Sequence, residues 1–431
     1  MTGIDELIIY RDFENGAILS DMTWIMEHYR AKERRSEVRE KFFSCMHALI
    51  DLAGNYGFEK NLWHTYLTYL LVNNENVFST ACEIRGITQG SLLRFAKHDF
   101  EIFRKLFAYD FTPLEQEIGA AFFEEILDYR SAGVSGKVFN KRICRRICEL
   151  SEQLGNAKDL ETFTQYMIHF YKEFGVGKLG LHKAFRVAHD ENGVQILPIT
   201  NIKHVNLDDL VGYEIAKKKL IENTEAFVQG RKANNCLLFG DAGTGKSSSI
   251  KAILNQYYDQ GLRMIEIYKH QFQDLNDVIA QIKNRNYRFI IYMDDLSFEE
   301  FEIEYKYLKA VIEGGLEKKP DNILIYATSN RRHLIREKFS DNKEERDGDI
   351  HTNDTIQEKI SLASRFGVTI FFGSPNKKEF QNIVKTLAQR YGVSMSEEEL
   401  LLEANKWELS HGGLSGRTAQ QFIDYLLGQM R

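Results

Sequence analysis

The residues with the clearest chemical potential form a glycine-rich run that ends in lysine and serine. The run Gly-Asp-Ala-Gly-Thr-Gly-Lys-Ser occupies residues 240–247 and follows the apolar run Cys236–Phe239. Its glycines let the backbone turn N–H groups inward at the start of a helix, where the helix dipole favours a phosphate. Lys246 would then reach the β- and γ-phosphates, and the Ser247 hydroxyl would hold Mg²⁺. The nucleotide-binding residues predicted from this run are Gly240, Asp241, Ala242, Gly243, Thr244, Gly245, Lys246, Ser247 and Ser248.

Two acids follow a second apolar run. Asp294 and Asp295 come directly after Phe289–Met293, at the carboxyl end of an expected strand. Ligands of open α/β sheets bind at that edge, and a magnesium-nucleotide site needs a carboxylate there. We therefore predict that Asp294 holds Mg²⁺ through water, and that Asp295 orients or deprotonates the attacking water.

Three further polar residues stand at suggestive places. Asn330 follows the apolar run Ile323–Thr328, and its amide could bind the attacking water or the γ-phosphate, or simply form a turn. Arg365 and Arg417 lie in Ser-Arg-Phe-Gly and Gly-Arg-Thr contexts. A guanidinium suits a polyphosphate because it donates paired hydrogen bonds and stays charged. For an isolated arginine, a surface ion pair is the ordinary alternative.

The elements that must position these residues change character along the chain. Apolar residues at helical spacing from 20 to about 174 predict an all-α N-terminal domain. Glycines gather over 174–198, which we interpret as the connection between domains. Gly175, Gly177 and Gly180 there match a dinucleotide-binding pattern, but the preceding residues are helical, so a hinge is favoured. Later apolar runs alternate with helices, as in a parallel sheet covered on both faces, and helices continue from 376 to the end.

Composition excludes several classes of protein. The 431 residues carry a formal charge of -6, which argues against a general nucleic-acid coat. Only 5 cysteines occur, without metal-ligand spacing, as expected in a reducing compartment. The N-terminal residues lack a secretion signal, and the most apolar stretch is too short to cross a bilayer. We therefore expect a cytoplasmic protein that has no membrane partner.

Six elements together resemble the AAA+ ATPase superfamily over about 206–431. They are Asp209–Glu214, the P-loop at 240–247, Asp294-Asp295, Asn330, Ser364–Gly367 and Gly416-Arg417. Four further segments are similar to an uncharacterised bacterial predicted-ATPase family catalogued as a domain of unknown function, namely Gly180–Arg186, Asp294–Phe298, Glu313–Glu317 and Thr328–Leu334. The resemblance implies that Val211 and Gly212 lie near the adenine of ATP, and that Asn330 senses the γ-phosphate. It also implies that Arg365 reaches the ATP of a neighbouring subunit in a ring or spiral, while Arg417 contacts its own subunit's nucleotide from a helical lid.

The expected fold class is therefore α/β, a P-loop NTPase αβα sandwich with a parallel sheet and a C-terminal helical lid. An all-α domain precedes it. The expected boundaries are 1–190 for the helical domain, 191–375 for the nucleotide-binding domain and 376–431 for the lid.

The expected function is binding of Mg²⁺ and ATP and hydrolysis to ADP and phosphate in an oligomer. Lys246, Asp295, Asn330, Arg365 and Arg417 are the candidate catalytic residues. Most AAA+ proteins carry glutamate where this chain has Asp295, so hydrolysis could be slow unless Glu299 or Glu300 compensates. One hypothesis is a machine that remodels nucleic acid or nucleoprotein; the alternative is a nucleotide-gated assembly or adaptor switch. A kinase is less favoured because a second substrate-binding motif is not evident.

The sequence gives less information about the protein or nucleic acid on which such an ATPase would act. The segment Lys269–Arg288 lacks the glycine of protein-threading loops. The charged segment Ser340–Asp349 reads as a solvated loop or as a partner contact. A basic helical face with Lys141, Arg142, Arg145 and Arg146 is either solvated or a surface for nucleic acid or an acidic protein.

Overall fold

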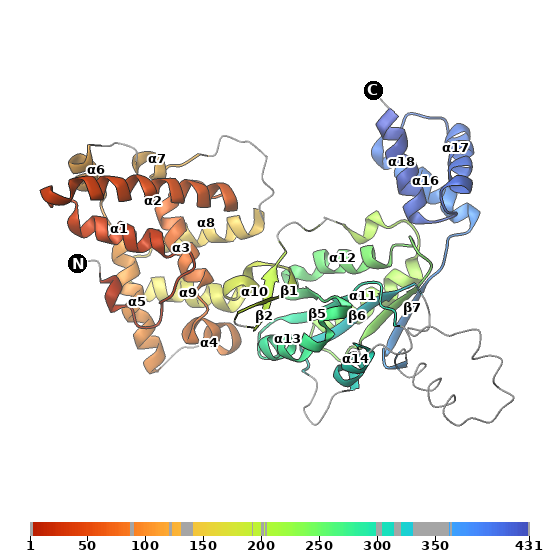
Figure 1. Cartoon of the computed structure of the whole chain (residues 1–431), viewed down its shortest axis with the longest axis horizontal. Coiled ribbons are helices and arrows are strands. Elements are labelled where there is room, and N and C mark those ends of the chain that lie inside the picture. The colour runs from red at the N-terminus through yellow and green to blue at the C-terminus, as the bar shows by residue number, and fades with distance from the viewer. Residues whose placement is uncertain are drawn as a thin grey trace. The chain divides into compact units, whose positions relative to one another are not determined.

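A computed structural model describes most of the chain (Figure 1). The described residues are 3–86, 90–119, 123–130, 141–191, 193–199, 202, 205–298, 304–313, 320–330, 362 and 364–429. They divide into two compact units, Met1–His182 and Lys183–Arg431. Residues 299 and 300 and the segment 340–349 lie outside the described residues, so their expected roles stay predictions.

The first unit is helical, which confirms the expected all-α N-terminal domain. Short 3-10 turns at Ile4–Glu6 and Lys32–Arg34 accompany its α-helices. The α-helices are α1 (Ala17–His28), α2 (Arg35–Tyr56), α3 (Leu62–Asn73), α4 (Val77–Arg85), α5 (Ser91–Phe107), α6 (Thr112–Ile118), α7 (Phe123–Leu127), α8 (Lys141–Gly155), α9 (Leu160–Phe174) and α10 (Gly177–Leu181).

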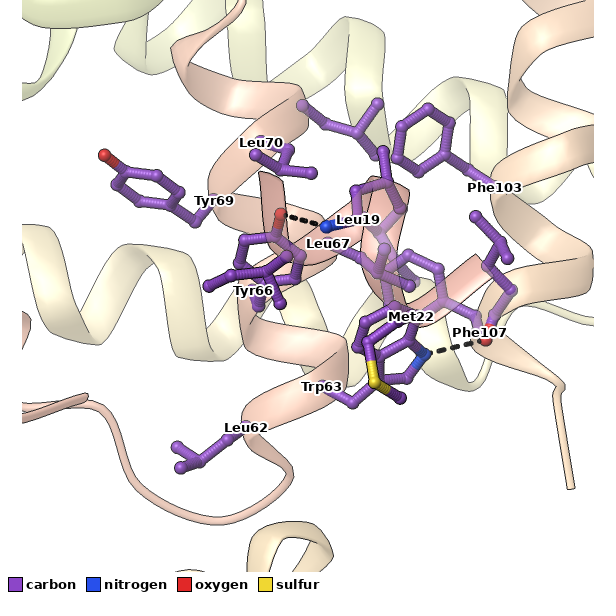
Figure 2. Packing of buried hydrophobic residues seen from close by; sticks show 14 of the residues in the cluster. Leu19, Met22, Leu62, Trp63, Tyr66, Leu67, Tyr69, Leu70, Phe103 and Phe107 are labelled. Carbon is purple, nitrogen blue, oxygen red and sulfur yellow. Dashed lines mark hydrogen bonds between the residues drawn. The ribbon is translucent and has the colours of Figure 1, made fainter. Parts of the chain in front are cut away.

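Helix α3 forms the centre of this unit. It is apolar on nearly every side, and almost all its residues are buried, as expected of a helix surrounded by others. Figure 2 shows how its aromatic side chains also satisfy polar groups: the Leu19 N–H donates to the Tyr66 hydroxyl at 2.9 Å. The Trp63 indole N–H donates to the Leu106 carbonyl at 3.0 Å. These bonds let large aromatic residues fill the core without leaving a polar atom unpaired.

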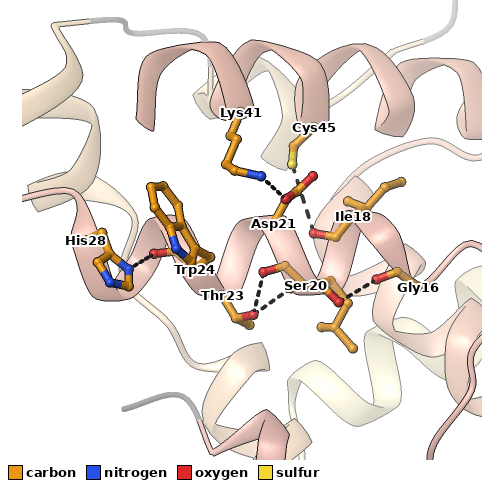
Figure 3. Close-up of polar contacts among 10 residues, drawn as sticks. Gly16, Ile18, Ser20, Asp21, Thr23, Trp24, His28, Lys41 and Cys45 are labelled. Atoms are coloured by element: carbon orange, nitrogen blue, oxygen red, sulfur yellow. Dashed lines mark hydrogen bonds and ion pairs between the residues drawn. The ribbon is translucent and has the colours of Figure 1, made fainter. Parts of the chain in front are cut away.

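Helices α1 and α2 pack together through both apolar and polar contacts (Figure 3). The Lys41 ammonium pairs with Asp21 at 2.5 Å. The buried Cys45 thiol faces the Ile18 carbonyl, and burial raises the pKa of this thiol to about 12. Cys45 is therefore a core residue rather than a reactive thiolate.

In its described residues, the second unit is built on a seven-stranded sheet of order β2-β1-β4-β5-β6-β3-β7. Its strands are β1 (Ala184–Asp190), β2 (Gly193–Pro198), β3 (Cys236–Gly240), β4 (Leu262–Glu266), β5 (Arg288–Met293), β6 (Ile323–Ser329) and β7 (Val368–Phe372). All neighbours pair in parallel except β1 and β2, which form an antiparallel hairpin.

The hairpin occupies residues that we had interpreted as a connection. Residues 184–198 instead extend the sheet, because β1 pairs with β4 from Ala184 opposite Met264. The glycines that suggested a linker lie before the hairpin and at its turn, where Gly193 has φ 101°. Helix α9 directly precedes Gly175, so the strand required before a dinucleotide-binding loop is not found there.

Helices cover both faces of the sheet. Helices α11 (Glu214–Val228) and α12 (Lys246–Tyr257) share one apolar core with the sheet, in which Ile250 and Leu220 meet Leu238 and Ile290. Helices α13 (Leu275–Ile282) and α14 (Glu304–Glu313) lie on the opposite face in Figure 1. Short 3-10 turns occur at Leu207–Asp209, Tyr258–Gln260 and Lys269–Asp274.

Three C-terminal helices have a core of their own. They are α16 (Lys377–Tyr391), α17 (Glu397–Ser410) and α18 (Gly416–Gln429), and they enclose buried Phe380, Val384, Phe422 and Ile423. The mostly parallel sheet covered by helices, followed by these three helices, confirms the αβα sandwich with a C-terminal helical part that was expected from the sequence. Among the described residues, none of the helices has the length and apolar character needed to cross a membrane.

Candidate functional site

The glycine-rich loop follows strand β3 directly and therefore lies at the carboxyl edge of the sheet. The loop begins at Gly240, whose φ of 135° is unfavourable for any residue with a Cβ. The neighbouring strand passes so close that a Cβ on Gly240 would lie 2.1 Å from the Phe372 carbonyl oxygen. Asp241 then ties the loop to the end of β7, because its carboxylate accepts from the Ser374 N–H at 2.7 Å. That bond lowers the pKa of Asp241 below its ordinary value.

Gly240→Ala is therefore expected to destabilise the protein strongly. The added methyl group meets backbone rather than a movable side chain, so β3 and β7 must separate, and we expect a cost of about 3 kcal/mol or more. Gly261→Ala is the matched control, since Gly261 also has a positive φ of 92° but open space around it. There we expect only backbone strain, of about 1 kcal/mol. Urea unfolding measures both, and equal losses would show that the close approach to Phe372 is unimportant.

The loop opens directly into helix α12, which begins with Lys246. This side chain is 6% exposed and donates to three oxygens: the Gly240 carbonyl at 2.9 Å, the Asp241 carbonyl at 2.6 Å and the Asn330 Oδ1 at 3.0 Å. Burial lowers the pKa of Lys246, and the nearby carboxylates of Asp241, Asp295 and Asp294 offset part of that effect. Lys246 thus reaches the loop interior, where a phosphate would lie.

Asp294 connects the loop to strands β5 and β6. Its Oδ1 accepts from the Ser247 hydroxyl at 2.7 Å and from the Thr328 hydroxyl at 2.6 Å. Burial alone would raise the pKa of Asp294, but these two hydrogen bonds lower it, so the carboxylate is ionised at neutral pH. A serine hydroxyl and a carboxylate are hard oxygen ligands of the type that Mg²⁺ binds, so the residues present fit this ion.

Asp295 and Asn330 form the next part of the network. Asp295 has a left-handed backbone with φ 51°, and its N–H donates to the Thr328 hydroxyl at 2.9 Å. The Asn330 amide donates from Nδ2 to Asp295 Oδ1 at 2.7 Å and accepts from Lys246 at its oxygen. Because both ends of the amide are used, its orientation follows from its partners. Asn330 thus bridges the P-loop lysine and the second acid.

Thr328 is a site residue that the sequence analysis missed. It donates to Asp294 and accepts from the Asp295 N–H, so it fixes both acids from the neighbouring strand. Its signal in the sequence is slight: it is a hydroxyl residue at the end of an otherwise apolar run. Only the pairing of β5 with β6 shows which acids it faces.

The lid contacts the loop through the start of α18. The Arg417 N–H donates to the Gly243 carbonyl at 3.1 Å, and the charge of Arg417 contributes slightly to the lowered pKa of Lys246. The lid also meets the segment expected near adenine: Arg390 pairs with Asp209 at 3.3 Å, and Val211 packs against the lid core. The neighbouring Gly212 has φ 85°. The structure therefore places Arg417 where the lid contacts the glycine-rich loop, and Val211 where the lid contacts the segment expected near adenine.

Arg365 has a different environment. It forms an ion pair with Glu313, the last residue of α14. Its side chain is 29% exposed, so part of it faces solvent. Its expected role toward a neighbouring subunit remains a prediction.

Comparisons with known proteins show what parts of the chain are similar to. The replication factor C large subunit of Staphylothermus marinus is 34% identical over 71 residues, which are 16% of this chain and 16% of the relative's length. Among solved structures, the Thermotoga maritima RuvB Holliday junction branch migration motor matches with a TM-score of 0.33 and 15% identity, over 52% of this chain and 72% of that chain. C. elegans PCH-2 matches with a TM-score of 0.35 and 16% identity, over 52% and 71%.

A family model covers much more of the sequence. It matches residues 180–430, which include the hairpin, the glycine-rich loop, both acids, Asn330 and the lid. This match spans more than half of the chain, and the chain therefore belongs to the family described as protein of unknown function (DUF815).

Proposed function

We propose that this protein binds ATP with Mg²⁺ and hydrolyses it to ADP and phosphate. The observation that carries the proposal is a continuous hydrogen-bond network at the carboxyl edge of β3, β5 and β6. It runs from Ser247 through Asp294, Thr328, Asp295 and Asn330 to Lys246. A phosphate-binding loop alone would support nucleotide binding only. The two acids beside it supply what a water attack on the γ-phosphate also requires.

Each residue of the site would have a role that follows from its chemical group. When bound, Mg²⁺ would neutralise phosphate charge and polarise the phosphate oxygens. Ser247 and Asp294 would hold the ion, and Lys246 would exchange its present carbonyl and amide partners for phosphate oxygens. Asp295 would orient or deprotonate the attacking water, while Asn330 would fix the carboxylate and the γ-phosphate relative to each other. Arg417 would add positive charge from the lid.

We propose further that Arg365 acts on the nucleotide of a second copy in a ring or spiral. Phosphate release per chain should then rise with protein concentration, and Arg365→Ala should lower it by about 10³-fold or more. Arg231→Ala is the matched control, since Arg231 is exposed and its guanidinium donates to nearby Gln229. Turnover that is independent of concentration, with Arg365→Ala as active as Arg231→Ala, would exclude action in trans.

A slow nucleotide-gated switch is the second candidate. It is favoured by the short Asp295 side chain, whose carboxylate is engaged by Asn330. The same phosphate-release assay separates the two, because a switch would bind ATP, associate and hardly turn over.

A nucleic-acid client is a weaker proposal. Its support is the basic face of α8, but Arg145 pairs with Glu149 at 3.8 Å, and Arg146 lies 4.1 Å over the Phe174 ring. Glu149 offsets part of the positive charge of this face, and the Arg146 guanidinium is held against an aromatic ring. Phosphate release measured with DNA or RNA, for the native chain and for Arg142, Arg145 and Arg146 changed together to glutamate, tests this client. Protein threading receives no support, because Phe272 and Tyr287 are buried.

A further inference from the structure

Tyr292 is a buried tyrosine beside the expected magnesium site. It lies on β5, two residues before Asp294, and is 1% exposed. Its hydroxyl lies next to Asp294, Ser247 and Thr328. Within the described part of the chain, that hydroxyl nevertheless makes no hydrogen bond of acceptable geometry. A buried hydroxyl without a partner costs free energy, so this atom requires an explanation.

The neighbouring strand supplies a direct comparison. Tyr292 on β5 pairs in register with Tyr326 on β6, so the two side chains point to the same face of the sheet. Tyr326 is equally buried, but its hydroxyl bonds to Asn223 at 3.0 Å and to Thr224 at 2.9 Å. The fold can therefore satisfy a tyrosine hydroxyl at this depth with protein groups. At Tyr292 the groups nearby are the proposed ligands of Mg²⁺.

The chemistry of these groups indicates the missing partner. Asp294 accepts from the Ser247 and Thr328 hydroxyls at its Oδ1. The hydroxyl of a tyrosine carries one proton that it can donate. A neutral phenol oxygen can also accept, and water bound to Mg²⁺ is a strong donor.

We propose that Tyr292 is a positioning residue for the magnesium ion. Its hydroxyl donates to the Asp294 carboxylate and accepts from a water of the Mg²⁺ shell when the nucleotide is bound. This inference rests on the proposed function and extends it by one residue. An aliphatic or phenylalanine side chain would fill the same space in the core without this contact.

The test is Tyr292→Phe, which removes only the hydroxyl. Binding of ATP is measured by calorimetry over a range of Mg²⁺ concentrations and in excess chelator, and thermal unfolding is measured without nucleotide. We expect unchanged or higher stability without ligand, because an unpaired polar atom is removed. The Mg²⁺ concentration needed for half-maximal ATP affinity should rise roughly two- to tenfold, the effect of one hydrogen bond. ATP binding in chelator should not change.

Tyr326→Phe is the matched control. It removes a hydroxyl with two protein partners, so it should lower the unfolding temperature and leave the Mg²⁺ dependence unchanged. If Tyr292→Phe has the native Mg²⁺ dependence while the native chain binds ATP with Mg²⁺, only this inference is wrong. Lower stability of Tyr292→Phe without ligand would also overturn it, by revealing a structural partner. If the native chain shows no binding of ATP with Mg²⁺, the proposed function fails, and this inference fails with it.

Discussion

Lys246→Ala should reduce the affinity for ATP by about 30-fold to more than 1,000-fold. The ammonium would contact two phosphates, and removing one partner of a desolvated charge pair costs about 2–5 kcal/mol. The side chain is already buried and directed into the loop by the Gly240 and Asp241 carbonyls. It therefore needs little reorganisation to meet a phosphate. Calorimetric titration with ATP and Mg²⁺ measures the loss directly.

Lys218→Ala provides the control for that experiment. Lys218 is an exposed lysine on α11 that faces Glu222 at 3.9 Å, so its removal should leave ATP affinity unchanged. Native-like binding by Lys246→Ala would contradict the proposed nucleotide site, provided that the variant is folded.

Because the pKa of Lys246 is lowered, both the stability of the protein and its affinity for ATP should depend on pH. The unfolded chain holds this proton more tightly than the folded chain does. Between the lowered folded pKa and the ordinary lysine value, stability therefore rises with pH. ATP affinity has the opposite dependence, because phosphate binds the charged amine. In the native chain, affinity should fall as pH rises through the lowered pKa, and the Lys246→Ala variant should lack that component.

The sequence was sufficient to predict the positions of residues that directly follow apolar strands. Lys246, Asp294 and Asn330 each follow a different apolar strand, and parallel strands bring their carboxyl ends to one edge. The structure joins these three residues through hydrogen bonds, as that argument required. Periodicity also predicted the all-α unit and the alternation of strands and helices.

Contacts that depend on strand register were not predictable in the same way. Thr328 appears in the sequence as an unremarkable member of an apolar strand, and only the pairing of β5 with β6 places it beside Asp294. Tyr292 lies two residues before Asp294 on the same strand, but the sequence does not show that its hydroxyl is without a hydrogen-bond partner among the described residues. The hairpin at 184–198 was missed for a related reason. Its strands mix buried and exposed residues and lie in the glycine-containing stretch that suggested a connection, and β1 becomes part of the sheet by pairing with distant β4.

Asp295→Asn is expected to leave ATP bound but to lower phosphate release by about 10²-fold or more, the usual contribution of a general base. The substitution suits the backbone, because asparagine tolerates the left-handed conformation that Asp295 adopts at φ 51°. Folding should therefore be preserved, and the effect should fall on the chemical step. Rapid-mixing measurements would show normal ATP binding followed by slow phosphate release.

Asp295→Glu tests whether the short side chain limits the reaction. Asp295 reaches Asn330 at 2.7 Å, and one more methylene would carry the carboxylate further toward the γ-phosphate. We expect turnover to rise several-fold, with a stability cost of about 1 kcal/mol because glutamate adopts a left-handed backbone less readily. A rise in turnover would indicate that this chain is an ATPase whose rate is limited by the short side chain of Asp295. If both variants retain native turnover, Asp295 does not act on the water, and another residue must be the base.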